Sequence, residues 1–251
     1  MRSNFSYLPT PPRPGSTLQA YLLGQVDFEA LLAVQQRLVY EVAGNRDQAV
    51  LILCEHPPLI TVGREGSRAH ILYELDELRS RELTVRWVNR GGGCWLHAPG
   101  QLAIYAVLPL DRLGLGLQAY VRRLETVARA VLADFYVPSH LHASHAGVWV
   151  GNRPLAPIGV AVRHWVSYYG AIFNVHPDLR PFRWVRLGHA DAGPMTSLER
   201  ERRGPLRPAL VRERFLEHFA AQFGFARTTL FFEHPQLTAA RRLVARDHSS
   251  V

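Results

Sequence analysis

Residues 90–101 read Arg-Gly-Gly-Gly-Cys-Trp-Leu-His-Ala-Pro-Gly-Gln, beginning at Arg90 and ending at Gln101. The three consecutive glycines, Gly91 to Gly93, have no β-carbons, so this backbone can adopt positive φ angles and let a ligand approach closely. Amides in such a loop can bind a carbonyl or a phosphate group. The loop has neither the lysine of a Walker loop nor the spacing of the dinucleotide fingerprint. It is therefore either a ligand-binding loop or a tight turn between two strands.

The segments on both sides of this loop alternate between strand and helix patterns. Asp27 can cap the first helix. The apolar spacing predicts strands at residues 18–23, 49–53, 59–62, 85–89, 101–108, 147–150, 158–166 and 168–175, and helices at residues 28–43, 75–82, 117–135 and 207–223. Helices and strands alternate early and strands cluster later. This order predicts an α/β fold in which helices pack on a mixed β-sheet.

The composition favours one domain without a membrane span. A chain of 251 residues with 47% hydrophobic residues can bury one sizeable core, and no long low-complexity linker divides it. No run of about 18 apolar residues occurs. Two cysteines are too few for a disulfide framework, so a cytoplasmic location is the default expectation.

The chain is basic and contains no lysine. Its net charge is +8, and all 29 of its basic residues are arginine. This charge indicates either solubility combined with a bias toward arginine, or an acidic partner. The arginines are spread along the chain, and no zinc-finger or RNP-type motif is present, so nucleic acid is not the expected partner.

Several ordered motifs resemble the lipoate-protein ligase B (octanoyltransferase) family. The loop matches the family at its arginine, two glycines, histidine and the final Pro-Gly-Gln. Further matches follow in order: His56-Pro57-Pro58 with Thr61-Val62-Gly63, Gly147-Val148-Trp149-Val150 with Ile158-Gly159-Val160, Tyr168-Tyr169-Gly170 with Asn174-Val175 and Asp178-Leu179, and Thr196-Ser197-Leu198. The resemblance covers residues 51–198 well and the flanks weakly.

The resemblance implies a domain like that of the biotin and lipoate ligases at residues 18–226. A proline-rich flexible segment at residues 1–17 would precede it, and a tail at residues 227–251 would follow. It implies transfer of an octanoyl or lipoyl group from acyl carrier protein to a lysine of a lipoyl domain, with no cofactor and no metal. The family's acyl-contacting segments correspond here to Arg90, Gly91, Gly92, Gly93, Cys94, Trp95, Leu96, His97, Pro157, Ile158, Gly159, Tyr169, Gly170 and Ala171.

The chain departs from the family at the catalytic residues. In the family a cysteine carries the acyl group as a thioester, and a lysine lowers the pKa of that cysteine. The lysine position is Pro154 here, and the cysteine position is Leu187, or Gly188 in a gapless alignment. Arginine cannot replace the lysine as a proton acceptor, because it stays protonated. Trp95 and Tyr169 stand where the family has a threonine and a histidine, and they could shorten the acyl pocket.

Other reactive side chains have weaker functional interpretations. Cys94 in the glycine loop, with His97 as a base, could act as a substitute nucleophile, but an inert buried thiol is the simpler interpretation. His140, His142 and His145 lack a further ligand nearby, so a surface cluster is favoured over a metal site. His189 and Asp191 form either an acid–base pair or polar loop side chains.

Three functions remain open from the sequence. The first is a transferase with a relocated nucleophile or with direct attack of the acceptor lysine on the thioester. The second is a catalytically inactive relative that binds an acyl group, acyl carrier protein or a lipoyl domain. The third is a nucleic-acid binder on the related ligase fold, which would have no need of a glycine loop beside an acyl tunnel.

Overall fold

The computed structural model of the chain describes residues 17–188 and 193–237. The flexible segment expected at residues 1–17 lies outside these ranges, apart from its last residue. Most of the expected tail, from residue 238 onward, lies outside them too. The same holds for His189 and Asp191, so the structure leaves their two interpretations open.

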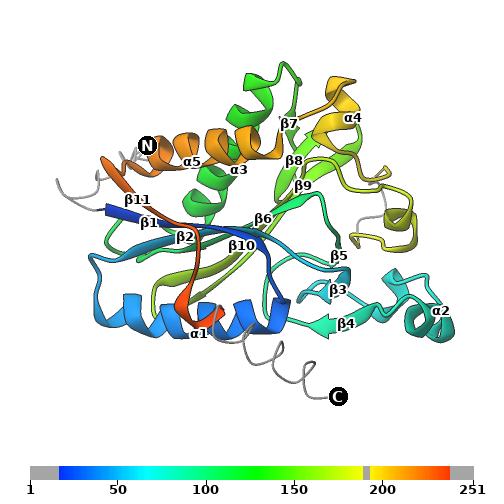
Figure 1. Cartoon of the computed structure of the whole chain (residues 1–251), viewed down its shortest axis with the longest axis horizontal. Helices are drawn as coiled ribbons and strands as arrows, with labels where there is room; N and C mark the ends of the chain where they lie inside the picture. The colour runs from blue at the N-terminus through cyan, green and yellow to red at the C-terminus, as the bar shows by residue number, and fades with distance from the viewer. Residues whose placement is uncertain (1–16, 189–192, 238–251) are drawn as a thin grey trace, which may run out of the picture.

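A mixed eight-stranded β-sheet runs through the centre of the molecule (Figure 1). Its parallel part is formed by β1 with its two neighbours, and every other pair is antiparallel. In spatial order the strands are β11 (Arg227–Phe231), β1 (Thr17–Gln25), β2 (Ala49–Glu55), β6 (Gln101–Val107), β10 (Val166–Asn174), β9 (Arg153–Arg163), β8 (Gly147–Val150) and β7 (His140–Leu141).

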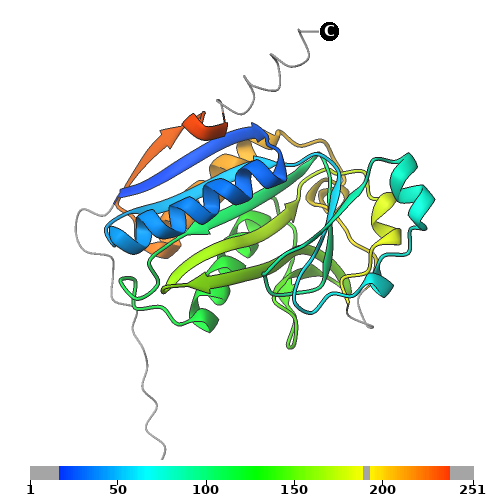
Figure 2. The same ribbon diagram turned by 90° about the horizontal axis from the view of Figure 1, so that it is seen from below.

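Helices cover both faces of this sheet (Figures 1 and 2). Helix α1 (Phe28–Gly44) packs on one face, and α3 (Leu117–Asp134) and α5 (Pro208–Phe223) pack on the other. The Asp27 side chain caps α1 by accepting a hydrogen bond of 2.9 Å from the Ala30 amide. The predicted mixed sheet with packed helices is confirmed. In the described part of the chain no helix is long and apolar enough to cross a membrane.

A smaller sheet of three strands carries the glycine loop. Its order is β4 (Thr84–Trp87), β3 (Leu59–Val62) and β5 (Cys94–His97), with β3 parallel to β4 and antiparallel to β5. The prediction of one loop from Arg90 to Gln101 was therefore wrong for its centre. Cys94 to His97 form a strand because all four side chains are buried, on alternate faces, between two hydrophobic clusters.

Other elements also differ from the sequence prediction. Strand β11 pairs with β1, so the sheet extends beyond the boundary predicted at residue 226. Strand β9 begins at Arg153 rather than at residue 158. The charged run after Ser197 forms helix α4 (Leu198–Arg202), capped by the Ser197 hydroxyl. Short helices η1 (Arg68–His70), α2 (Leu75–Ser80) and η2 (Pro181–Trp184) complete the described fold.

Candidate functional site

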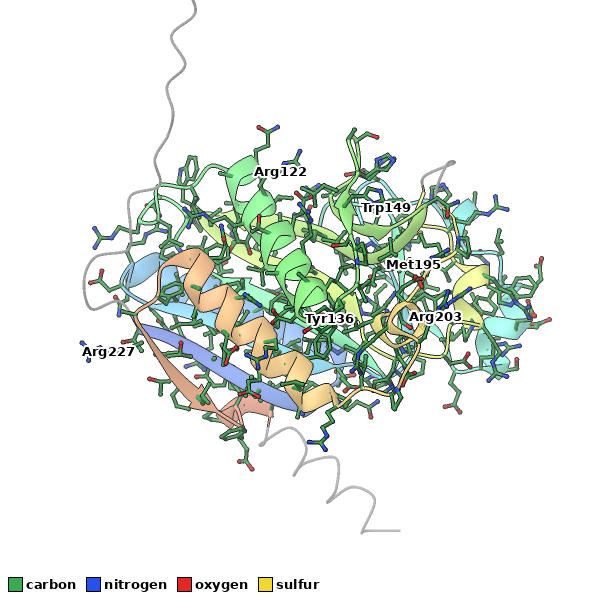
Figure 3. All side chains as sticks on the ribbon, turned by 90° about the horizontal axis from the view of Figure 1, so that it is seen from above. Arg122, Tyr136, Trp149, Met195, Arg203 and Arg227 are labelled. Atoms are coloured by element: carbon green, nitrogen blue, oxygen red, sulfur yellow. The ribbon has the colours of Figure 1, made fainter. Side chains whose placement is uncertain are left out.

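A cavity of about 250 Å³ lies beside the glycine loop, between β9 and the start of α3. Its polar residues include the exposed Arg64 and Glu65. Trp149, labelled in Figure 3, borders it from β8. Most of the remaining wall is apolar or glycine, namely Gly91, Gly92, Gly93, Trp95, Leu117, Val121, Ala146, Pro154, Pro157, Ile158, Gly159, Val160 and Leu187.

A second cavity of about 480 Å³ continues from the first along α3. The two cavities share Leu117, Val121, Ser144, His145 and Ala146 as wall residues. The first cavity is close to the lower end of the range for small-molecule sites, which begins at about 300 Å³. The two cavities are therefore adjacent, and the first of them lies at the glycine loop.

Two glycines of this region are required by close backbone contacts. A β-carbon on Gly93 would lie 1.8 Å from the carbonyl oxygen of Leu187. A β-carbon on Gly159 would lie 2.4 Å from the carbonyl oxygen of Gly91 and 2.8 Å from the Trp95 ring. The glycine loop therefore packs directly against β9 on one side and against the segment of Leu187 on the other.

The loop amides take part in the fold. The Gly91 amide donates to the Val160 carbonyl at 3.0 Å. The Gly92 amide donates to the Glu65 carboxylate at 3.1 Å. These two amides are thus already hydrogen-bonded, and the interpretation that the loop amides bind a ligand does not hold for them in this conformation.

Arg90 supports the loop from inside the protein. Its side chain is buried and does not border the cavity. The guanidinium lies 3.4 Å from the centre of the Trp95 ring and donates to the Gly91 carbonyl and to both oxygens of Thr61. Burial lowers the pKa of Arg90 to about 9. Trp95 in turn is held between Arg90 and Gly159, and its ring forms part of the cavity wall.

The segment from Tyr169 to Ala171 does not border the cavity, contrary to the sequence prediction. Tyr169 is buried in the cluster around α1, with a positive φ of 58°. Its amide donates to the Gln35 side chain at 2.9 Å, and burial raises its pKa to about 12. A β-carbon on Gly170 would lie 2.1 Å from the Ile104 carbonyl, and Ala171 packs in the main core. These residues belong to the core because β10 is central in the sheet.

Cys94, Leu96 and His97 also lie away from this cavity. The Cys94 thiol is buried and donates to the Ser67 carbonyl at 3.3 Å, and burial raises its pKa. This geometry favours the inert thiol over a substitute nucleophile. Leu96 and His97 border a different cavity of about 390 Å³. The residues that the resemblance assigns to acyl contact were expected to line one pocket, and only some of them do.

His97 belongs to a buried polar cluster between the two sheets. Its Nε2 lies 2.9 Å from the Thr61 hydroxyl, and its Nδ1 has no hydrogen-bond partner among the described residues. The neighbouring His56 contacts the Val26 carbonyl and the Tyr105 hydroxyl, each at 2.7 Å. Burial lowers the pKa of His97 well below its ordinary value and that of His56 to about 4. Both rings are therefore neutral at pH 7.

Both positions at which the resemblance expects catalytic residues border the cavity. Pro154 lies at the start of β9, where its carbonyl accepts a hydrogen bond from the Thr196 amide at 3.0 Å. Leu187 lies opposite, against Gly93. The chain has no lysine, and its two cysteines, Cys54 and Cys94, are buried elsewhere. The described cavity wall thus contains neither a thiol nor a primary amine.

Two residues of the histidine cluster border the joined cavities: His145 belongs to the wall that both share, and His142 borders the second. The rings of His142 and His145 stack with centroids 4.7 Å apart, and His142 lies 4.9 Å from the Trp149 ring. His140 is exposed on β7. His145 can stack on His142 because β7 ends at Leu141 and the chain turns back. The described residues contain no group of three or more side chains that could hold a metal.

Several wall residues were not predicted from the sequence. Arg64 and Glu65 directly follow the Thr61-Val62-Gly63 motif, so a search one or two residues beyond it could have found them. Leu117 and Val121 belong to the apolar stripe of α3, and nothing in that stripe separates wall residues from core residues. Ser144 and His145 lie in a loop without a motif.

Comparison with known proteins gives a consistent result. Residues 27–220 match the sequence profile of the lipoyl protein ligase A/B catalytic domain. An octanoyltransferase of Geotalea uraniireducens is 38% identical over 192 residues, which cover 76% of this chain and 86% of that protein. An octanoyltransferase of Desulfotalea psychrophila is 35% identical over 205 residues, covering 80% and 92% of the two chains.

Solved structures share the fold at low sequence identity. Lipoate-protein ligase A bound with ATP superposes with a TM-score of 0.67 at 15% identity, over 93% of this chain and 97% of that chain. A Thermoplasma acidophilum structure of a bipartite lipoate protein ligase and its lipoyl domain gives 0.63 at 15% identity, over 91% and 93%.

Proposed function

This chain belongs to the lipoyl protein ligase A/B family, and from that premise we propose that it handles octanoyl or lipoyl groups passing from acyl carrier protein to lipoyl domains. The observation that supports this most is the cavity at the glycine loop, whose wall is mostly apolar or glycine. Apolar walls stabilise a hydrocarbon chain by removing it from water. The cavity also borders positions 154 and 187, where the family's reactive groups are expected.

The chemistry in this chain does not use a cysteine-bound acyl group. No lysine is available to activate a thiol, and burial of both cysteines keeps them protonated and out of reach. Arginine cannot supply a neutral amine. Transfer therefore runs directly from the carrier thioester to the acceptor lysine, helped mainly by positioning of the two substrates.

The charge of the protein supports acidic protein partners. The net charge is +8, and Arg64 stands exposed at the cavity. Opposite charges raise the rate at which partners meet and orient them before contact. An acidic carrier protein and an acidic lipoyl domain are the partners that this charge favours.

A second candidate is a relative that binds the acyl group or its carrier without turnover. The absence of a thiol and an amine from the described cavity wall is the observation that favours it. Where the second candidate binds the acyl group itself, it shares this binding with the first, and the two differ only in whether the acceptor domain gains mass.

Calorimetric titration tests the shared requirement. We expect the protein to bind octanoyl-carrier more tightly than the carrier without its acyl group. Val121 lines both cavities, so the larger side chain of Val121→Trp should occupy space in them and weaken this binding about tenfold or more. Val162→Trp, at an exposed position near the far end of β9, is the matched control and should leave it unchanged. Equal affinity for acylated and unacylated carrier would refute acyl binding. If acyl binding is found, the mass of the lipoyl domain after incubation separates the two candidates.

A further inference from the structure

Gly91 leaves room for a small group of a ligand on the side where a side chain would stand. The three atoms nearest to a β-carbon on Gly91 would be the Val160 carbonyl oxygen at 3.7 Å, Nη2 of Arg64 at 3.8 Å and the α-carbon of Gly159 at 4.0 Å. These are ordinary contact distances, and all four residues border the cavity at the glycine loop. The space beside Gly91 therefore belongs to this cavity, and the Arg64 guanidinium lies at its edge.

The fold holds Arg64 in this place. Its amide donates to the Arg90 carbonyl at 2.9 Å, and the next amide, that of Glu65, donates to the Gly92 carbonyl at 3.1 Å. The Arg64 side chain donates through Nη1 to the Asn89 carbonyl at 3.1 Å. Both the backbone and the side chain of Arg64 are thus hydrogen-bonded to the glycine loop or to the residue before it.

The Nη2 group of Arg64 remains available to a ligand. Within the described part of the chain it has no hydrogen-bond partner, and Arg64 forms no ion pair there. The neighbouring Glu65 carboxylate instead accepts from the Gly92 amide at 3.1 Å. Because a guanidinium stays protonated, a charged donor lies beside the space at Gly91. An oxygen that carries or develops negative charge is the ligand group that suits it.

We propose that Arg64 binds the carbonyl oxygen of the acyl thioester beside Gly91 and stabilises the oxyanion formed in direct transfer. This inference rests on the proposed function. The neutral amine of the acceptor lysine attacks the carbonyl carbon, the C–N bond forms, and the C=O electron pair moves to the oxygen next to Nη2. The C=O bond then reforms, the C–S bond breaks, and the carrier leaves as a thiolate. The nitrogen gives one proton to water and the thiolate takes one from water, so the products are an amide and a free thiol.

This role needs only charge and a hydrogen bond, which arginine supplies without accepting a proton. A donor that is already in place when negative charge develops requires no reorganisation, and removal of one such donor from an enzyme site lowers the rate about 100-fold. Arg64 is exposed, so water screens its charge. We therefore expect a smaller effect, of about tenfold.

Infrared spectroscopy of bound octanoyl-carrier, isotope-labelled at the thioester carbonyl, tests the contact without turnover. A hydrogen bond from a cation weakens the C=O bond, so binding to the wild-type protein should shift the carbonyl stretch to lower frequency. Arg64→Ala should lose this shift, and Arg64→Lys should keep part of it. Gly91→Ala should fold normally, because Gly91 has no positive φ and the methyl group meets its neighbours at contact distance. It should lose the shift too, because the methyl group occupies the place of the oxygen.

Single-turnover transfer measures the catalytic effect. Octanoyl-carrier and a lipoyl domain are mixed with saturating protein, and the mass of the lipoyl domain is followed over time. Arg64→Ala should be about tenfold slower, with unchanged thermal stability and carrier binding, and Arg64→Lys should be intermediate. Arg79→Ala is the matched control, since it removes an exposed arginine of α2 that borders none of the three cavities described above. It should change neither the infrared shift nor the rate.

Other outcomes would overturn the proposal. A wild-type carbonyl frequency in Arg64→Ala or in Gly91→Ala would place the thioester oxygen elsewhere. A rate loss that only follows weaker carrier binding would show that Arg64 attracts the carrier and does not act on the carbonyl. A wild-type protein that binds the carrier and shifts the carbonyl stretch, but transfers nothing, would exclude the catalytic role and leave the contact in place. Absence of carrier binding would remove the proposed function itself.

Discussion

The carbonyl oxygen of Leu187 lies 1.8 Å from the point where a β-carbon on residue 93 would be, so Gly93 and Leu187 are in direct backbone contact. This contact joins the glycine loop to the segment that should carry the family's cysteine. The shape of the cavity at this end depends on it, since both residues form its wall.

Replacement of Gly93 by alanine should therefore destabilise the protein. The new methyl group would overlap a backbone oxygen that cannot move without shifting the Leu187 segment. We expect a loss of about 1–3 kcal/mol in the free energy of unfolding, measured in urea. Gly44→Ala in the last turn of α1 meets no atom within 4 Å and is the control. Equal denaturation midpoints for the two variants would contradict the contact.

Acid should destabilise the protein through His56. Its pKa is lowered from 6.5 to about 4 by burial, so below pH 6.5 the unfolded chain binds a proton that the folded protein does not. Stability is therefore complete above pH 6.5 and falls as the pH drops toward 4. The loss reaches about 3 kcal/mol for this group. His97, whose pKa is lowered in the same direction, should add to it.

Urea unfolding at several pH values between 4 and 7 checks this expectation. His56→Gln removes the titrating group, and the pH dependence of its stability should be flatter than that of the wild-type protein. The exposed His176→Gln serves as the control. A pH dependence unchanged by His56→Gln would assign the acid sensitivity to other groups.

Both thiols should be unreactive in the native protein. Cys54 and Cys94 are buried, and burial raises the pKa of each, so the reactive thiolate is scarce. A thiol-specific reagent at pH 8 should modify both in denaturant and neither under native conditions over the same time. Rapid native modification of Cys94 would reopen its candidacy as a nucleophile.

Octanoyl transfer by the wild-type protein should stay below about one per cent of the rate of a family member with its cysteine and lysine. The cysteine and the lysine act as a unit, so loss of both lowers the transfer rate about as much as loss of one. Steady-state mass spectrometry of the lipoyl domain measures this, with such an enzyme run in parallel. A higher rate that is abolished by Cys94→Ala would show a relocated nucleophile.

Restoring the two reactive groups should recover part of the transfer. Leu187→Cys with Pro154→Lys puts a thiol and an amine on the cavity wall, and a covalent acyl adduct should appear on the protein. Gly188→Cys with Pro154→Lys tests the other alignment, in which the thiol would face His70. Leu187→Ser with Pro154→Lys is the control that lacks the thiol. If neither cysteine variant forms an adduct, the cavity itself is unsuited to the thioester.

The sequence predicted the sheet and its helices because their apolar patterns are long and regular, as in α1 and α3. It missed β5 because the glycines and Pro99 suggested an irregular loop, while the pairing with β3 depends on residues more than thirty positions earlier. Of the residues that the resemblance implied, Gly91 to Gly93, Trp95 and Pro157 to Gly159 border one cavity. Tyr169 and His97 could not be separated from the wall residues, because only tertiary packing decides which face of a strand borders a cavity.

The pairing of β11 with β1 has a practical consequence for anyone who shortens this protein. Ending the chain at residue 226, where the sequence alone suggests a boundary, would remove the strand that covers the outer edge of β1 from Thr17 to Tyr21. An open edge of this kind offers a row of unpaired amides and carbonyls to any other strand. Such a fragment should self-associate into aggregates even though the residues that line the cavity at the glycine loop are all present. A loss of soluble material would then be mistaken for an effect on the site.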